Sequence, residues 1–391
     1  MAVLISELRI HNYRCLQGVG SSLGDVTVLF GPNGAGKSAL LDALWFVRDC
    51  AVNGAEKASS RRSHGVGLRW DRADPDEPVE VMLTTSDASY VVRVGYSAGR
   101  MEPFPGEELT LADGASLIQR RVGATEASLR NFGTNRIFPH PLREPERLSL
   151  GLLLDFDARW TAAAKIDSAL RNTRFHHSRS VNLFRLRTDG SEAGYDYYLS
   201  ERGENLFSVL RNLQARSSAD DRYQRVMHYM AQAFPGFSGL VLDPVGVGGV
   251  YGRFVIDGLH EPVYASGVSD GHLQMLLVLT ALFAEERPSL LLLDEPDLSL
   301  HPWALATLAE ACIEAAGTDR RQVVLATHSP VLLSQFEPAE VLAFETADGA
   351  TRVSRLSEIG EIADLLDQYS LGSLYMAQAV AAQQVAAVPG A

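Results

Sequence analysis

Cysteine is scarce in this sequence of 391 residues, with only Cys15, Cys50 and Cys312 far apart along the chain. An odd, scattered set of thiols excludes a disulfide framework and a cysteine-based zinc site, and it suits the reducing cytoplasm. Long apolar runs are also missing, because the most apolar stretch, residues 273–284, is too short to span a bilayer. The N-terminus lacks the basic start and long apolar run of a secretory signal. We therefore expect a cytoplasmic protein without membrane contact.

Positive charge is in deficit: 35 Lys and Arg face 48 Asp and Glu, for a net charge of −13 and a pI of about 5.3. This balance excludes a protein that coats nucleic acid with its whole surface, so any DNA contact must come from a local patch. The length and the 46% hydrophobic content are enough for two lobes with cores of their own.

Strand and helix patterns alternate at both ends of the sequence. The predicted strands are residues 3–10, 26–30, 79–94, 290–293 and 322–326, and the predicted helices are residues 39–47, 206–215, 222–234, 272–284 and 302–315. Such alternation indicates an α/β fold with a mostly parallel sheet covered by helices on both faces. We expect a β-rich N-terminal lobe (residues 1–114), a largely helical insertion (residues 115–250) and a C-terminal part of the first lobe (residues 251–391).

The sharpest motif, GPNGAGKS at residues 31–38, fits the G-x-x-x-x-G-K-[ST] phosphate loop without a gap. Small residues let backbone N–H groups turn toward phosphate oxygens, and the positive end of the following helix faces the same anion. Lys37 brings a cation to the β- and γ-phosphates, and Ser38 offers its hydroxyl to Mg²⁺. The expected nucleotide contacts are Asn33, Gly34, Ala35, Gly36, Lys37 and Ser38. The sequence thus predicts binding of ATP with Mg²⁺.

Four leucines at residues 290–293 precede Asp294 and Glu295, which suits a strand buried on both faces that ends in two acids. Ligands of open α/β sheets bind at the carboxyl ends of strands, so we expect Asp294 to hold Mg²⁺ and Glu295 to polarise the attacking water. Simple surface charge is the alternative. His328 follows the strand at residues 322–326, where a hydrogen bond to the γ-phosphate is expected, although a lone histidine after a strand is usually structural.

A last motif, SGVSDGH at residues 266–272, opens the predicted helix 272–284. Serine and glycine at a helix start can cap the helix or bind an anion, and taken alone the ordinary cap is favoured.

These four motifs in this order resemble the ABC-type P-loop ATPase heads of the SMC, RecF and OLD families. DEPDLSLHP at residues 294–302 and ERGENL at residues 201–206 resemble the AAA-21 or OLD-like subgroup. The resemblance implies that Ser269 and Gly271 form the ABC signature, that Asp297 and Ser299 lie in a D-loop, and that Arg14 lies near the nucleotide. It also implies that ATP joins two heads, with the signature of one subunit closing over the γ-phosphate of the other.

The resemblance has two gaps. No long heptad region is present, so the chain lacks the coiled-coil arm of an SMC protein. The stretch after His328 is short for the Toprim nuclease domain of an OLD protein. The expected partners are therefore a second copy, bound through ATP, and a separate nuclease or effector subunit.

Between residues 171 and 187 five arginines occur without an acid: Arg171, Arg174, Arg179, Arg185 and Arg187. Phe175 and Phe184 lie among them. Arginines neutralise phosphates and phenylalanines stack on bases, so DNA is one expected ligand. A solvated surface or a docking site for an acidic partner are the alternatives.

The predicted function is an ATPase whose head-to-head dimer gates a DNA-directed partner activity in repair or anti-phage defence. A slow ATP-dependent switch or scaffold for a toxin or effector is the main alternative. A transporter nucleotide-binding subunit fits less well, because the chain departs from the Leu-Ser-Gly-Gly-Gln signature and has a large insertion.

Overall fold

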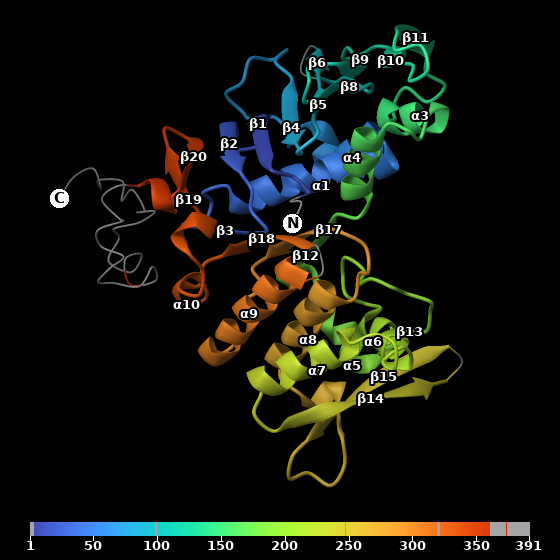
Figure 1. The fold of residues 1–391 in the computed structure, drawn as a ribbon. Coiled ribbons are helices and arrows are strands. Elements are labelled where there is room, and N and C mark those ends of the chain that lie inside the picture. The colour runs from blue at the N-terminus through green and yellow to red at the C-terminus, as the bar shows by residue number, and fades with distance from the viewer. Residues whose placement is uncertain (1–3, 98–99, 247, 319–320, 360–372, 374–391) are drawn as a thin grey trace, which may run out of the picture.

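A six-stranded sheet runs through the middle of the molecule in the computed structural model, which describes residues 4–97, 100–246, 248–318, 321–359 and 373 (Figure 1). Its strand order is β12-β17-β18-β3-β19-β20. The strands are β12 (Arg174–His177), β17 (Ser289–Asp294), β18 (Arg321–Thr327), β3 (Val26–Phe30), β19 (Val341–Ala347) and β20 (Ala350–Arg355). The first five are parallel and β20 is antiparallel to β19. The carboxyl ends of the parallel strands therefore meet at one edge.

The strands of this sheet alternate their side chains between two hydrophobic cores. Every residue of β17 is buried: Leu290 and Leu292 face one core, while Leu291 and Leu293 face the other. The prediction of a strand buried on both faces is confirmed.

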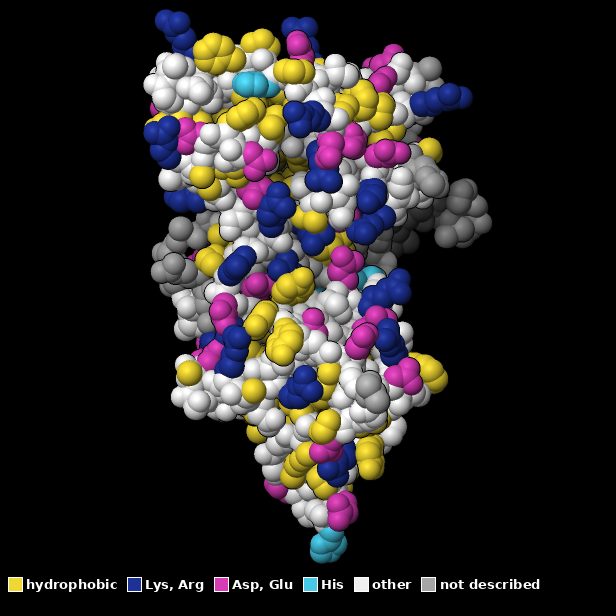
Figure 2. Space-filling model, turned by 90° about the vertical axis from the view of Figure 1, so that its right-hand side faces the viewer, with side chains coloured by type: hydrophobic (Ala, Val, Ile, Leu, Met, Phe, Trp, Pro, Cys, Tyr) yellow, Lys and Arg dark blue, Asp and Glu magenta, His cyan; other side chains and the backbone are white. Residues whose placement is uncertain are grey.

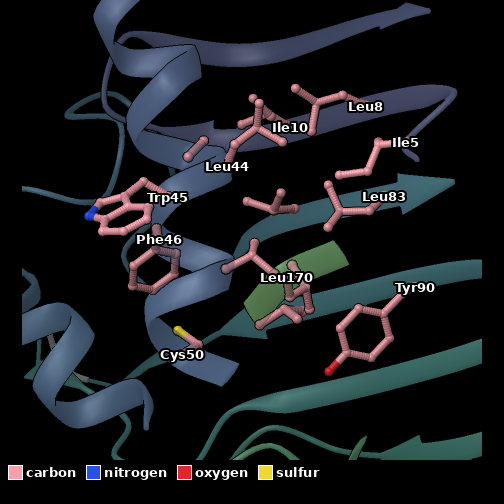
Figure 3. Packing of buried hydrophobic residues seen from close by; sticks show 14 of the residues in the cluster. Ile5, Leu8, Ile10, Leu44, Trp45, Phe46, Cys50, Leu83, Tyr90 and Leu170 are labelled. Carbon is pink, nitrogen blue, oxygen red and sulfur yellow. The ribbon is translucent and has the colours of Figure 1, made fainter. Parts of the chain in front are cut away.

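The first core lies between the central sheet and an eight-stranded antiparallel sheet of order β11-β10-β9-β8-β5-β4-β1-β2. Its strands are β1 (Glu7–Tyr13), β2 (Leu16–Ser22), β4 (Val79–Thr84), β5 (Ala88–Val94), β8 (Gly106–Leu111), β9 (Ser116–Arg120), β10 (Glu126–Arg130) and β11 (Ile137–Pro141). Helices α1 (Lys37–Asn53), α3 (Ser149–Phe156) and α4 (Thr161–Arg171) contribute to this core. Figure 3 shows Leu44 of α1 beside Ile10 of β1, with Leu83 of β4 and Leu170 of α4 in the same cluster.

The second core joins the other face of the central sheet to a mainly helical layer. Its helices are α6 (Leu206–Ala215), α7 (Arg222–Ala233), α8 (Asp270–Phe283) and α9 (Pro302–Thr318). A small sheet of β13 (Ser191–Glu192), β14 (Phe237–Val245), β15 (Gly249–Ile256) and β16 (Val263–Tyr264) packs with them. Helix α8 is buried along nearly its whole length, because leucine and other apolar residues occupy all its sides.

The shorter elements connect these layers. They are α2 (Ala55–Ser60), β6 (Tyr96–Ser97), β7 (Arg100–Met101), α5 (Leu183–Thr188), α10 (Pro330–Leu333) and 3-10 turns at Ser63–Gly65, Ser178–Ser180, Ala265–Gly267, Pro338–Glu340 and Leu356–Glu358. No helix in the part of the chain that the structure describes combines the length and apolar composition of a bilayer span.

The fold is the predicted α/β type, with a mostly parallel central sheet, a β-rich N-terminal lobe and a helical layer. The division at residues 114 and 250 stays a prediction, but hydrogen bonding crosses the first boundary. Strands β9, β10 and β11 extend the N-terminal sheet, and β12 joins the central sheet. Beyond residue 250, β15 pairs with β14 in the small sheet, so the region expected to resume the first lobe begins inside the second layer.

Candidate active site

The phosphate loop lies where β3 ends and α1 begins, at the carboxyl edge of the central sheet. Two glycines are required by space as well as by backbone shape. Gly31 has a φ of 152°, and a Cβ there would lie 2.3 Å from the carbonyl oxygen of Phe344. Gly36 has a φ of 104°, and its Cβ would lie 2.4 Å from Oγ1 of Thr351. Since Thr351 also donates a hydrogen bond to the Ala35 carbonyl at 2.8 Å, β20 holds the loop from behind.

Lys37 lies buried inside the curl of this loop. Its ammonium donates hydrogen bonds to the carbonyl oxygens of Gly31 at 2.8 Å and Pro32 at 2.9 Å. Burial lowers the pKa of Lys37 to about 8, against the opposing effect of three nearby carboxylates. The two carbonyl groups stabilise the charged ammonium of Lys37 at the position where the motif predicts a phosphate.

Ser38 and Asp294 meet beside it, although they come from opposite ends of the sequence. The Ser38 hydroxyl donates to Oδ1 of Asp294 at 3.1 Å. Burial raises the pKa of Asp294, while the Ser38 hydrogen bond and nearby His177 act in the opposite direction. A hydroxyl and a carboxylate are hard oxygen donors that fit Mg²⁺, which usually takes one or two protein ligands and completes its shell with water and phosphate. These two residues would hold the ion beside a bound triphosphate.

Glu295 follows Asp294 with a left-handed backbone, at a φ of 55°. Its N–H donates to the carbonyl oxygen of Ala326 in β18 at 2.9 Å, which fixes the turn after β17. The carboxylate is forked by Arg179: Nε lies 2.5 Å from Oε2 and Nη2 lies 3.1 Å from Oε1. Both oxygens of the expected base are therefore engaged.

His328 lies between the lysine and this glutamate. Its Nδ1 is 3.4 Å from Nζ of Lys37, and its Nε2 is 3.9 Å from Oε1 of Glu295. Burial, reinforced by Lys37, lowers the pKa of His328 and favours the neutral ring. A neutral ring with one N–H is suited to donate a hydrogen bond to an anion at this edge.

The predicted signature residues contact a different part of the chain. Ser269 is the N-terminal cap of α8, and its Oγ lies 2.8 Å from Nδ1 of His272. At Gly271 an added Cβ would lie 2.7 Å from the carbonyl oxygen of Ser299. Asp297 accepts a hydrogen bond from the Thr327 hydroxyl at 2.8 Å. The turn predicted to be the signature thus packs on the predicted D-loop of the same chain, with Ser269 exposed.

The arginine run has acidic neighbours in space, although no acid occurs within residues 171–187 of the sequence. Each arginine contacts a carboxylate: Arg171 with Asp167, Arg174 with Glu285, Arg179 with Glu295, Arg185 with Glu204 and Arg187 with Asp270. Phe175 packs against Trp45 with ring centroids 6.0 Å apart, while Phe184 is exposed. Figure 2 shows basic and acidic side chains interspersed over one face of the molecule.

Arg14, also predicted near the nucleotide, contacts Asp42 at 2.7 Å.

Sequence reasoning missed two residues of the site, His177 and Arg179. Strand β12 runs parallel to β17 with His177 opposite Asp294, so its carboxyl end reaches the same sheet edge. Nδ1 of His177 lies 3.4 Å from the Asp294 carbonyl oxygen and 3.7 Å from Oδ2. The sequence signal for β12 was the short segment RFHH, followed by polar residues. This segment lacks the β-branched residues that mark a strand.

A family model matches most of the chain. The AAA_21 model, described as "AAA domain, putative AbiEii toxin, Type IV TA system", matches residues 26–334. That span contains the phosphate loop, the β17 acids and His328.

The chain is also similar to a curated phage protein. The Old nuclease of Escherichia phage P2 is 24% identical over 373 residues, which cover 88% of the chain and 59% of the phage protein. The chain thus spans somewhat more than half the length of this relative.

Solved structures of SMC heads have the same fold. One is an SmcHead bound to the C-winged helix domain of ScpA, with a TM-score of 0.52, 17% identity and coverage of 90% of the chain and 97% of that structure. Another is an Smc head with an extended coiled coil bound to the C-terminal domain of ScpA, from Pyrococcus furiosus. It has a TM-score of 0.52, 14% identity and coverage of 94% of the chain and 100% of that structure. The fold is therefore that of ABC-type ATPase heads.

Proposed function

The chain belongs to the AAA_21 family, and from this membership we propose that it binds ATP with Mg²⁺ and hydrolyses it to ADP and phosphate. The observation that carries the proposal is the meeting of Ser38 with Asp294 at the edge where Lys37, Glu295 and His328 also lie. A phosphate-loop cation, two oxygen ligands for Mg²⁺ and a carboxylate for water are the parts that phosphoryl transfer requires.

The proposed roles follow from these positions. Backbone N–H groups of residues 33–38 and the ammonium of Lys37 bind the β- and γ-phosphates. Ser38 and Asp294 would hold Mg²⁺, which would supply positive charge to neutralise the charge that develops on the phosphate oxygens. Glu295 accepts a proton from the attacking water, and His328 donates a hydrogen bond to the γ-phosphate.

We propose a head-to-head dimer as the active form. Ser269 is exposed at the N-terminal end of α8, and its contacts within the described residues do not include the phosphate loop. A helix start with an exposed serine is suited to bind an anion of another molecule, so the signature of one subunit would close over the γ-phosphate of its partner.

We propose that this dimer gates a separate DNA-directed nuclease or effector in the cytoplasm, in repair or anti-phage defence. The similarity to a phage nuclease over part of its length supports this assignment. A slow switch or scaffold is the second candidate, and the engagement of both Glu295 oxygens by Arg179 favours it. Direct DNA contact through the arginine run is weakly supported, because each arginine already has an acidic partner.

Turnover of Mg-ATP measured with and without DNA separates these candidates. A DNA-gating ATPase is expected to change its rate when DNA is added, together with the partner subunit if one is required. A switch is expected to turn over slowly in both conditions. Absence of ATP binding would contradict both.

A further inference from the structure

The fork between Arg179 and Glu295 blocks the chemistry expected of the glutamate. The two hydrogen bonds, Nε to Oε2 at 2.5 Å and Nη2 to Oε1 at 3.1 Å, occupy both oxygens of the carboxylate that would accept the water proton. A bidentate arginine–carboxylate contact is also among the strongest of charged hydrogen bonds. In this arrangement Glu295 is poorly placed to take a proton from water.

When the two side chains separate, the arginine is the one free to move. Glu295 is fixed by its N–H bond to Ala326 and by the Leu298 N–H, which donates to its carbonyl oxygen at 3.1 Å. Its side chain is 18% exposed, whereas that of Arg179 is 65% exposed. Arg179 belongs to the turn Ser178–Ser180, directly after β12.

The guanidinium is also close to the position of the phosphates. Glu295 lies 3.9 Å from His328, and His328 lies 3.4 Å from the ammonium of Lys37. Arg179 is therefore separated from the phosphate-loop cation by two side chains in contact. A planar guanidinium matches phosphate oxygens as well as it matches a carboxylate, and a triphosphate carries more negative charge than Glu295.

We propose that Arg179 exchanges partners during turnover, from Glu295 in the nucleotide-free chain to the γ-phosphate of Mg-ATP in the same chain. This inference rests on the proposed ATPase function and adds one catalytic residue to it. The water oxygen then bonds to the γ-phosphorus while the bond to the β–γ bridging oxygen breaks. The water proton passes to the freed Glu295 carboxylate, and the electron pair leaves on ADP. Arg179 stabilises the charge on the transferring phosphoryl oxygens.

The turn that carries Arg179 is tied to the helix of the predicted signature. Gln274 of α8 donates a hydrogen bond from Nε2 to the Ser178 carbonyl oxygen at 3.2 Å. Because Ser269 lies at the N-terminus of the same helix, a partner subunit that displaces this N-terminus would also displace the Arg179 turn. The exchange therefore offers a route by which dimerisation releases Glu295.

The test compares the steady-state kinetics of Arg179→Ala and Arg179→Lys with those of the wild type. We expect Arg179→Ala to lower kcat by about 100-fold or more, the scale of a lost transition-state donor. The dissociation constant for a non-hydrolysable ATP analogue should rise by much less than kcat falls, because the ground-state contact with the γ-phosphate replaces the Glu295 contact, whereas charge develops on the phosphoryl oxygens only in the transition state. Binding of ADP with aluminium fluoride, which mimics the transferring phosphoryl group, should weaken in parallel with kcat. Arg179→Lys, which keeps the charge without the fork, should recover only part of the rate.

Arg159→Ala is the matched control. Arg159 also forks a carboxylate, that of Asp157, and its side chain is 66% exposed, so it tests loss of an exposed arginine fork elsewhere. It should keep the wild-type kcat. Thermal melting of each variant shows whether the fold is intact.

The outcomes separate this inference from the proposed function. Wild-type turnover that Lys37→Ala abolishes supports the ATPase, and undiminished or faster turnover of Arg179→Ala would then overturn the exchange alone. A wild type that does not hydrolyse Mg-ATP overturns both.

Discussion

The hydroxyl of Ser38 donates a 3.1 Å hydrogen bond to Oδ1 of Asp294, across 256 positions of sequence. The contact joins the first turn of α1 to the end of β17, so it aligns a phosphate loop with an acidic strand end. Between them they present the two protein oxygens that a Mg²⁺ ion bound to a triphosphate requires.

Replacing Ser38 with Ala is expected to weaken the use of Mg²⁺ more than the binding of ATP. Loss of one oxygen ligand should raise the Mg²⁺ concentration for half-maximal turnover by about tenfold or more. Ser86→Ala is the control, because Ser86 also bonds an aspartate, Asp87 at 2.9 Å, but on an exposed turn. Equal Mg²⁺ requirements for the two variants would remove Ser38 from the metal site.

ATP affinity should fall as pH rises through about 8. The buried Lys37 has a pKa lowered to about 8 in the free chain, so a growing share of it is neutral above that pH. Phosphate oxygens favour the charged form of Lys37. Above about pH 8, ATP binding must therefore be accompanied by uptake of a proton. The apparent Kd is expected to be flat well below pH 8 and to rise at most about tenfold per pH unit above it.

Calorimetry in two buffers of different ionisation enthalpy measures this proton uptake directly. Uptake should be present near pH 9 and nearly absent near pH 6.5, and Lys37→Ala should lack it at both. A pH-independent affinity over this range would mean that Lys37 does not meet the phosphates.

Glu295→Gln is expected to bind ATP and accumulate as an ATP-bound dimer. Glutamine keeps the size of the side chain but does not accept the water proton. Hydrolysis then no longer ends the closed, ATP-bound dimer, which accumulates. Light scattering with Mg-ATP should show a doubled mass for this variant and not for Glu345→Gln, an exposed residue on β19. A monomer with ATP demonstrably bound would contradict closure by the signature of a second subunit.

A buried charge cluster between Asp49 of α1 and the arginines after α2 leads to a stability prediction. Asp49, whose side chain is 1% exposed, accepts hydrogen bonds from Arg62 at 3.1 Å and Arg61 at 3.3 Å. Arg62 is itself only 5% exposed. Asp49→Ala leaves the buried Arg62 guanidinium with Asp42 as its remaining carboxylate and should cost about 1–3 kcal/mol of unfolding free energy.

Denaturant unfolding followed by circular dichroism measures that loss. Arg352→Ala is the control, since its ion pair with Asp348 is on the surface and 3.6 Å long, and it should change the midpoint little. Matching midpoints for the two variants would show that the Asp49 cluster does not stabilise the lobe.

The parts of the site that were predictable are those encoded in short runs of sequence. GPNGAGKS fixes a strand, loop and helix start through its glycines, and LLLLDEP fixes a buried strand with acids at its end. Helices α6 and α7 were found because their apolar residues repeat with helical spacing.

The missed parts depend on contacts between distant residues. Strand β12 is four residues long and is held by its hydrogen bonds to β17, so nothing local marks it as a strand. The acid that faces Arg179 lies 116 positions away, and Arg174 likewise meets Glu285. A run of arginines therefore looked like an unpaired patch in the sequence and is compensated in the fold.

In the proposed function, Lys37 anchors the phosphates of ATP for hydrolysis. Phosphate release from Mg-ATP, measured for the wild type, Lys37→Ala and Lys57→Ala, tests it most directly. Lys57 is an exposed lysine of α2 and serves as the matched control. We predict turnover by the wild type and Lys57→Ala, and a rate at least about 100-fold lower for Lys37→Ala. Unchanged turnover in Lys37→Ala would show that Lys37 does not anchor the phosphates.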